Sequence, residues 1–126
     1  CLVRSFIDSA RHDVASSLES CFRMAGAEVA FTGSYPGWKP NPDSEILATM
    51  KQSFKKLKGD DPKVVAMHAG LECGILGAVY PHWDMISVGP TIRYPHSPDE
   101  KVHIQSVARF WNFLTETLKN VPEFKM

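Results

Sequence analysis

The feature that most constrains the fold is a run of turn-forming residues, GSYPGWKPNPDS, at positions 33–44. This segment contains three prolines and two glycines. Because proline lacks a backbone N–H and is excluded from helix interiors and central strands, neither a helix nor a strand can run through its middle. We therefore predict two parts, residues 1–34 and residues 35–126.

The first part has the pattern of a strand, a helix and a second strand. Residues 2–8 and 28–32 alternate in polarity, which is typical of short strands. Between them, Ser9 is the predicted N-cap of a helix that Gly26 ends. The apolar residues of this helix share one face: Val14, Leu18, Cys21, Phe22 and Ala25.

The second part alternates between helix and strand patterns. A helix capped by Asn41 is predicted to run to Gly59, followed by a strand at 63–68, a short helix at 71–79 and a strand at 84–88. Residues 101–104 again alternate like a strand, and a last helix is expected from Gln105 or Ser106. The alternation favours an α/β fold with helices packed on a parallel sheet.

Charge and composition exclude several classes of protein. The 14 basic and 14 acidic residues cancel, so the basic excess that binds phosphate backbones is missing, and we expect no nucleic-acid partner. No run of about 18 uncharged apolar residues is present, so we expect no membrane span. Three cysteines without a CxxC pair favour a reducing cytoplasm. The chain opens on Cys1 inside a strand-like pattern, which suggests a fragment of a longer protein.

The segment HAGLECG at 68–74 is one candidate site, because it joins a predicted strand to a predicted helix. His68 and Glu72 have the spacing of a zinc-binding HExxH pair, but a strand-to-turn geometry would not place them on one helix face. A buried, hydrogen-bonded histidine and a helix-start carboxylate explain them equally well. Cys73 could be an activated thiol at a helix start, although a packed cysteine is the commoner case.

The loop GPTIRYPHSPDE at 89–100 is the second candidate site. Arg93 can hold a carboxylate through its planar guanidinium, and His96 can bind a metal or transfer a proton. Three prolines restrict the loop, which suits a preorganised site. A surface loop with no role in binding is an equally good explanation from composition alone.

These segments, taken in order, resemble the C-terminal part of the bacterial aminoacyl-histidine dipeptidases, zinc peptidases of the M20 metallopeptidase family. The resemblance rests on AMHAGLECG and DMISVGPTIRYPHSPDEKV, with VRSFIDSARHD and SYPGWKPNPDS upstream. It covers nearly the whole chain. The chain differs at Tyr94-Pro95, where this family usually has Gly-Ala.

The resemblance implies a function and an architecture. Residues 1–34 would be the end of a lid and dimerisation domain, and residues 35–126 the C-terminal section of a zinc-peptidase catalytic domain, joined at a hinge. The intact enzyme would be a cytoplasmic homodimer that hydrolyses Xaa-His dipeptides with two zinc ions. The alternative is a non-catalytic α/β module for binding or oligomerisation.

The resemblance also implies roles for three residues. His96 matches a metal ligand, and Glu72 and Arg93 match positions that line the substrate side of the pocket. The other metal ligands and the general-base glutamate of the family lie upstream of this segment, so no catalytic residue is assigned here. We therefore expect the 126 residues alone to be inactive.

Overall fold

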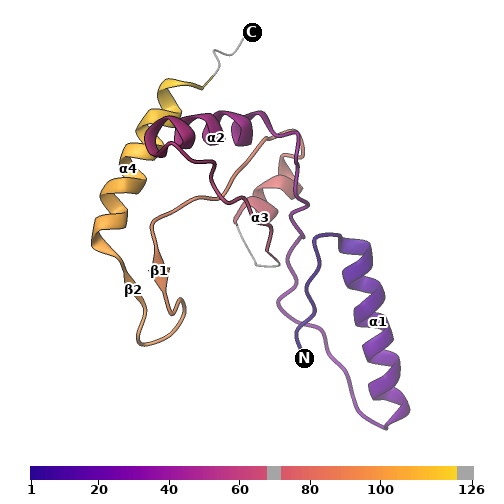
Figure 1. The fold of residues 1–126 in the computed structure, drawn as a ribbon. Coiled ribbons are helices and arrows are strands. Elements are labelled where there is room, and N and C mark those ends of the chain that lie inside the picture. The colour runs from indigo at the N-terminus through magenta and orange to yellow at the C-terminus, as the bar shows by residue number, and fades with distance from the viewer. Residues whose placement is uncertain (68–71, 122–126) are drawn as a thin grey trace. The chain divides into compact units, whose positions relative to one another are not determined.

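A computed structural model describes residues 1–67 and 72–121. The described part contains helices α1 (Asp8–Met24), α2 (Glu45–Lys58), α3 (Glu72–Val79) and α4 (Ile104–Lys119), and strands β1 (Ile92–Arg93) and β2 (Lys101–Val102) (Figure 1). The chain forms two compact units. The first comprises Cys1–Asn41 and Val65–Trp83, and the second comprises Pro42–Val64 and Asp84–Met126.

In the first unit, α1 begins one residue earlier than its predicted cap. Ile7 occupies the N-cap position with an extended backbone and gives no side-chain cap, so the prediction of Ser9 is wrong. The carboxylate of Asp8 instead forms an ion pair with Arg11 at 3.1 Å and accepts the backbone N–H of Gly37 at 3.0 Å. An acidic residue in the first turn is favourable beside the helix N-terminus.

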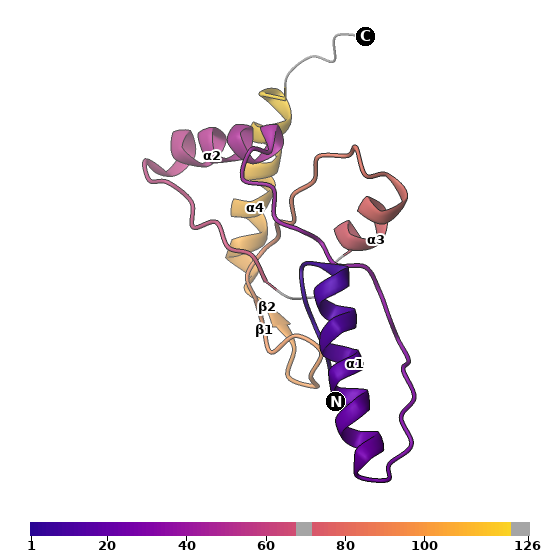
Figure 2. The same ribbon diagram turned by 90° about the vertical axis from the view of Figure 1, so that its right-hand side faces the viewer.

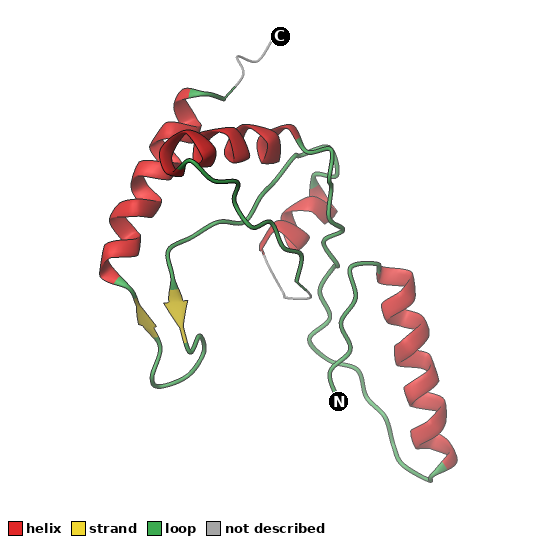
Figure 3. Cartoon of the chain, in the orientation of Figure 1, coloured by secondary structure: helices red, strands yellow, loops and turns green. Residues whose placement is uncertain are grey.

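The two strands predicted on either side of α1 are not strands in the structure. Residues 2–7 and 28–32 form irregular segments (Figure 3). Both border a cavity of about 590 Å³ beside α1 instead of pairing with each other. A strand exists only where a neighbour accepts and donates its backbone hydrogen bonds, and alternating polarity does not supply that neighbour.

The turn-rich segment packs closely within the first unit. A Cβ added to Gly37 would lie 2.7 Å from the backbone oxygen of Phe6, and one added to Gly74 of α3 would lie 2.9 Å from that of Pro36. Glycine is the residue that permits such close backbone approach. After α3, the rings of Tyr80 and Trp83 stack with centroids 4.3 Å apart.

In the second unit, α2 has well-defined signals at both ends. The side chain of Ser44 accepts the backbone N–H of Leu47 at 3.0 Å, so Ser44, and not the predicted Asn41, caps the helix. Gly59 ends it in a left-handed conformation with φ of 82°, as its position in the sequence predicts.

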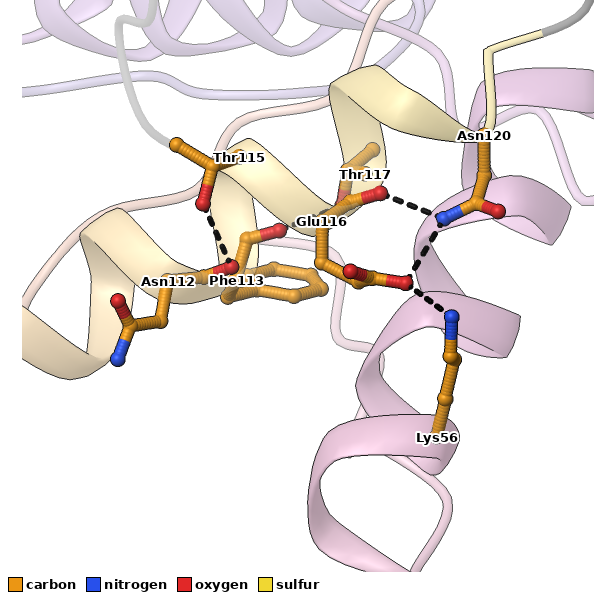
Figure 4. Close-up of polar contacts among 7 residues, drawn as sticks. All are labelled: Lys56, Asn112, Phe113, Thr115, Glu116, Thr117 and Asn120. Atoms are coloured by element: carbon orange, nitrogen blue, oxygen red, sulfur yellow. Dashed lines mark hydrogen bonds and ion pairs between the residues drawn. The ribbon is translucent and has the colours of Figure 1, made fainter.

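Helix α4 packs against α2, and together they form the core of the second unit. The rings of Phe54 and Phe113 meet edge to face with centroids 5.7 Å apart, and Met50, one turn before Phe54 on α2, is buried. At the end of α4, the carboxylate of Glu116 accepts from Lys56 at 2.6 Å and from Asn120 at 3.1 Å (Figure 4). The hydrogen bonds from Lys56 and Asn120 lower the pKa of Glu116 below its usual value.

The β structure of the second unit is an antiparallel hairpin that leads directly into α4 (Figure 2). The mixed α/β class is therefore correct in outline, but the predicted parallel sheet is not present in the described residues. Residues 63–67 and 84–88 are irregular, and His68 lies outside the described residues. A short apolar run is compatible with a strand, but a strand forms only where a neighbouring backbone pairs with it.

Candidate functional site

The β1–β2 hairpin carries two of the predicted site residues, Arg93 and His96. In the ladder, Ile92 lies opposite Val102 and Arg93 lies opposite Lys101. The hairpin is joined to the start of α4, because the N–H of His103 donates to Thr91 at 2.9 Å and the N–H of Thr91 donates to the Ser106 hydroxyl at 2.9 Å. The two ends of the loop are thus held by backbone and helix contacts.

The loop between the strands has an unusual backbone. Tyr94 and His96 adopt positive φ angles of 53° and 64°. The left-handed region costs an ordinary residue about 1–2 kcal/mol, and histidine enters it more readily than most residues. Such a conformation persists only where surrounding interactions hold it, and it is frequent at functional sites.

Hydrogen bonds within the loop provide those interactions. The carboxylate of Glu100 accepts the backbone N–H of His96 at 2.7 Å. The N–H and hydroxyl of Ser97 donate to the Tyr94 carbonyl at 3.2 and 2.8 Å, and the N–H of Glu100 donates to the Ser97 carbonyl at 3.0 Å. The ammonium of Lys101 lies 5.3 Å from the centre of the Tyr94 ring. The loop is therefore ordered by its own contacts.

The side chains of Arg93 and His96 remain exposed on this ordered loop. Within the described residues, no carboxylate lies within ion-pair distance of Arg93, and neither ring nitrogen of His96 has a hydrogen-bond partner. An exposed guanidinium can bind a carboxylate, and an exposed neutral imidazole can bind a metal ion.

Glu72, the third predicted residue, lies in the first unit. It is the first residue of α3 and is exposed. Its neighbour Cys73 is half-buried and free of a disulfide. A carboxylate in the first turn of a helix interacts favourably with the positive end of the helix dipole.

The described residues do not contain a complete metal site. Among residues 1–67 and 72–121, no three histidine, cysteine, aspartate or glutamate side chains are close enough to hold one ion. His96 fits the role of one metal ligand, because its imidazole is exposed on an ordered hairpin loop and has no hydrogen-bond partner among the described residues. Structural and catalytic zinc sites need three or four protein ligands, a number that the described residues do not bring together.

Two roles of acidic residues were not predicted from sequence. The hydrogen bond from the His96 backbone N–H to the Glu100 carboxylate has only a weak signal in the sequence, which is a carboxylate four residues after the histidine. Asp84 accepts the backbone N–H of Ile46 at 3.0 Å, at the start of α2 and 38 residues away in sequence. Burial raises the pKa of Asp84, but bonds from Ile46, Ser44 and neighbouring backbone groups outweigh it and lower that pKa overall. No local pattern signals such a contact.

The chain is similar to a curated dipeptidase. It is 47% identical over 122 residues to the cytosol non-specific dipeptidase of Escherichia coli strain K12. The match covers 97% of this chain and 25% of that protein, so the chain spans about a quarter of its relative's length. No protein-family model matches the chain. None of the helices in the described part has the length and apolar character that a membrane span requires.

Proposed function

We propose that this chain is the C-terminal portion of a cytosolic enzyme that hydrolyses dipeptides. The observation that carries the proposal is the 47% identity over 97% of the chain to a protein named as a dipeptidase. The ordered hairpin with an exposed arginine and histidine supports it, because it presents a carboxylate-binding group and a metal-binding group three residues apart.

The proposed metal is zinc, and His96 is its proposed ligand in this segment. Bound zinc would lower the pKa of a water molecule and polarise the peptide carbonyl. The contribution of this chain is to hold one neutral imidazole in place. Two zinc ions, with the remaining ligands and the general base elsewhere in the parent chain, complete the proposed site.

Arg93 and Glu72 are the proposed substrate contacts. A dipeptide has a carboxylate at one end and an ammonium at the other. The guanidinium of Arg93 suits the carboxylate through paired hydrogen bonds, and the carboxylate of Glu72 suits the ammonium.

A preference for Xaa-His dipeptides is the finer part of the proposal. The E. coli relative is named as non-specific, so the range of substrates needs a direct measurement. Turnover of a panel of Xaa-His dipeptides and matched dipeptides without histidine tests it. Equal kcat/KM across the panel would reject the preference and leave dipeptide hydrolysis intact.

Homodimerisation through residues 1–34 is also proposed, on the same resemblance. Sedimentation of the full-length parent chain and of one lacking those residues tests it, and a dimer in both would reject it. The competing function, a non-catalytic binding or oligomerisation module, predicts no hydrolysis by the full-length chain.

Two substitutions in the full-length parent chain test the site. His96→Ala should lose bound zinc and reduce turnover by more than about a hundredfold. Mutation of a residue that only supports a metal ligand reduces activity about 10–100-fold, and loss of the ligand itself has a larger effect. Glu72→Ala should keep its zinc while kcat/KM falls about 10–100-fold, the effect of losing one charge-assisted hydrogen bond of about 1.5–3 kcal/mol.

His103→Ala is the matched control. His103 is exposed beside the same hairpin and contributes backbone bonds that alanine also makes. It should retain normal zinc content and rate. Full zinc occupancy and normal turnover in His96→Ala would remove the proposed metal role of the hairpin.

A further inference from the structure

We propose that Glu100 is a positioning residue that holds the His96 backbone in its left-handed conformation and so prepares the imidazole to bind metal. This inference rests on the proposed function, which makes His96 a metal ligand. It assigns to Glu100 a role through the backbone of another residue, without contact to the metal or the substrate.

The first support is the geometry of the contact. Glu100 Oε2 accepts the His96 N–H at 2.7 Å, the short distance expected of a hydrogen bond to a charged acceptor. His96 has a φ of 64°, a conformation that an unrestrained histidine seldom adopts. The bond therefore stabilises a backbone state that the local chain does not favour by itself.

The second support is that Glu100 is itself anchored. It directly precedes β2, whose Lys101 is paired with Arg93 of β1. Its own N–H donates to the Ser97 carbonyl at 3.0 Å. The Glu100 carboxylate thus fixes the His96 backbone relative to the β1–β2 ladder.

The third support is that the side chain of His96 does not take part in these contacts. The bond to Glu100 uses the backbone N–H, and in the described part of the chain the imidazole has no hydrogen-bond partner. A ligand whose backbone is already ordered loses less conformational entropy when it binds, so affinity rises through preorganisation. Removing the carboxylate should weaken metal binding without removing a ligand.

The test uses the full-length parent chain with Glu100→Ala and Glu100→Gln. Zinc affinity is measured by competition with a chelator, and the exchange rate of the His96 amide is measured in the zinc-free protein. Glutamine keeps an oxygen that accepts the N–H but removes the charge. We expect Glu100→Ala to weaken zinc binding about 10–100-fold and to speed exchange of the His96 amide, with Glu100→Gln restoring most of both.

The outcomes separate this inference from the proposed function. Unchanged zinc affinity in Glu100→Ala, alongside loss of zinc in His96→Ala, would overturn the positioning role and keep the metal role. Equal losses in Glu100→Ala and Glu100→Gln would overturn it too, because charge and not the accepted bond would then matter. Normal zinc binding by His96→Ala would instead reject the metal role. If Glu100→Ala does not fold, unchanged exchange of the His96 amide in Glu100→Gln supports the inference, and fast exchange overturns it.

Discussion

At the scale of single residues, the candidate site depends on backbone conformations that side-chain type does not favour. Tyr94 and His96 both lie in the left-handed region and are two residues apart in the sequence. Glycine occupies this region without penalty, and the family that the chain resembles usually has glycine where this chain has Tyr94. The loop thus carries a conformational cost that its hydrogen bonds and the contact of Lys101 with the Tyr94 ring offset.

Comparison of Tyr94→Gly with Tyr94→Ala tests this cost. Both variants lose the ring, but only alanine retains a Cβ in the left-handed region. We expect Tyr94→Gly to be more stable than Tyr94→Ala by about 1 kcal/mol, the reverse of the usual order for ordinary strand and helix positions. Hydrogen exchange of the hairpin amides in the full-length chain measures the difference. A more stable alanine variant would contradict the observed backbone.

Asp84 is the other residue whose role depends on tertiary structure. Its carboxylate lies at the start of α2, where it accepts the backbone N–H of Ile46. The carboxylate therefore adds to the cap made by Ser44 and ties the 84–88 segment to α2. Replacement by alanine removes an acceptor while the helix donors remain.

We expect Asp84→Ala to destabilise the first turn of α2 by about 1 kcal/mol, the usual net value of such a hydrogen bond. Exchange of the Ile46 amide in the full-length chain should then be about five times faster. The folded pKa of Asp84 is below its usual value of 3.8, so its stabilisation is complete above that value and is lost as pH falls through the folded pKa. The difference between the two proteins should therefore disappear in acid; a difference that grows there would contradict the assigned contact.

At the scale of elements, the contact between α2 and α4 defines the second unit. Each helix supplies one aromatic ring to the contact, Phe54 from α2 and Phe113 from α4. Each also supplies one member of the ion pair at its edge, Lys56 from α2 and Glu116 from α4 (Figure 4). The rings of Phe54 and Phe113 are half-buried, whereas the Lys56 side chain of the ion pair is exposed. Dissolved salt weakens an exposed ion pair by screening its charges. The rings should therefore contribute more than Lys56 and Glu116 to the docking of the helices.

A double-mutant cycle with Phe54→Leu and Phe113→Leu measures the aromatic contribution. Leucine keeps most of the apolar volume but cannot form an edge-to-face contact. We expect a coupling energy of about 0.5–1.5 kcal/mol in denaturant unfolding of the full-length chain. A control cycle that pairs Phe54→Leu with Trp111→Leu, a change at an exposed position of α4, should give a coupling near zero.

At the scale of the whole molecule, much apolar surface is exposed in the described residues. On α4, the exposed apolar residues recur at helical spacing: Ile104, Val107, Trp111 and Leu118. Only one large apolar side chain in the described part, Met50, is classed as buried. Monomeric soluble proteins seldom leave so much apolar surface in contact with water, which agrees with the proposal that this chain is part of a larger protein.

We therefore expect the 126-residue chain alone to show no dipeptidase activity, even with added zinc, and to bind zinc weakly. One imidazole supplies one of the three or four ligands that a stable site requires. Equilibrium dialysis against zinc and a dipeptide hydrolysis assay measure both, with the full-length parent chain as the positive control. Hydrolysis by the purified 126-residue chain would show that it contains a site of its own.

Local sequence patterns are sufficient to locate the helices. Each observed helix falls within a residue or two of its prediction at most ends, because apolar spacing and end signals such as Gly59 act within one or two turns of the chain. The sequence also identified Arg93 and His96 as neighbours on one constrained loop, since proline restricts the backbone locally.

The strands and the long-range contacts depend on how distant segments pack together. The predicted strands at 2–8, 28–32 and 84–88 are not formed, because strand formation requires a partner that the pattern of one segment does not specify. The link from Asp84 to Ile46 spans 38 residues, and the bond from His96 to Glu100 requires a left-handed backbone that a hairpin imposes. Local sequence encodes periodicity and caps, whereas contacts between distant backbones arise only when the folded chain brings them together.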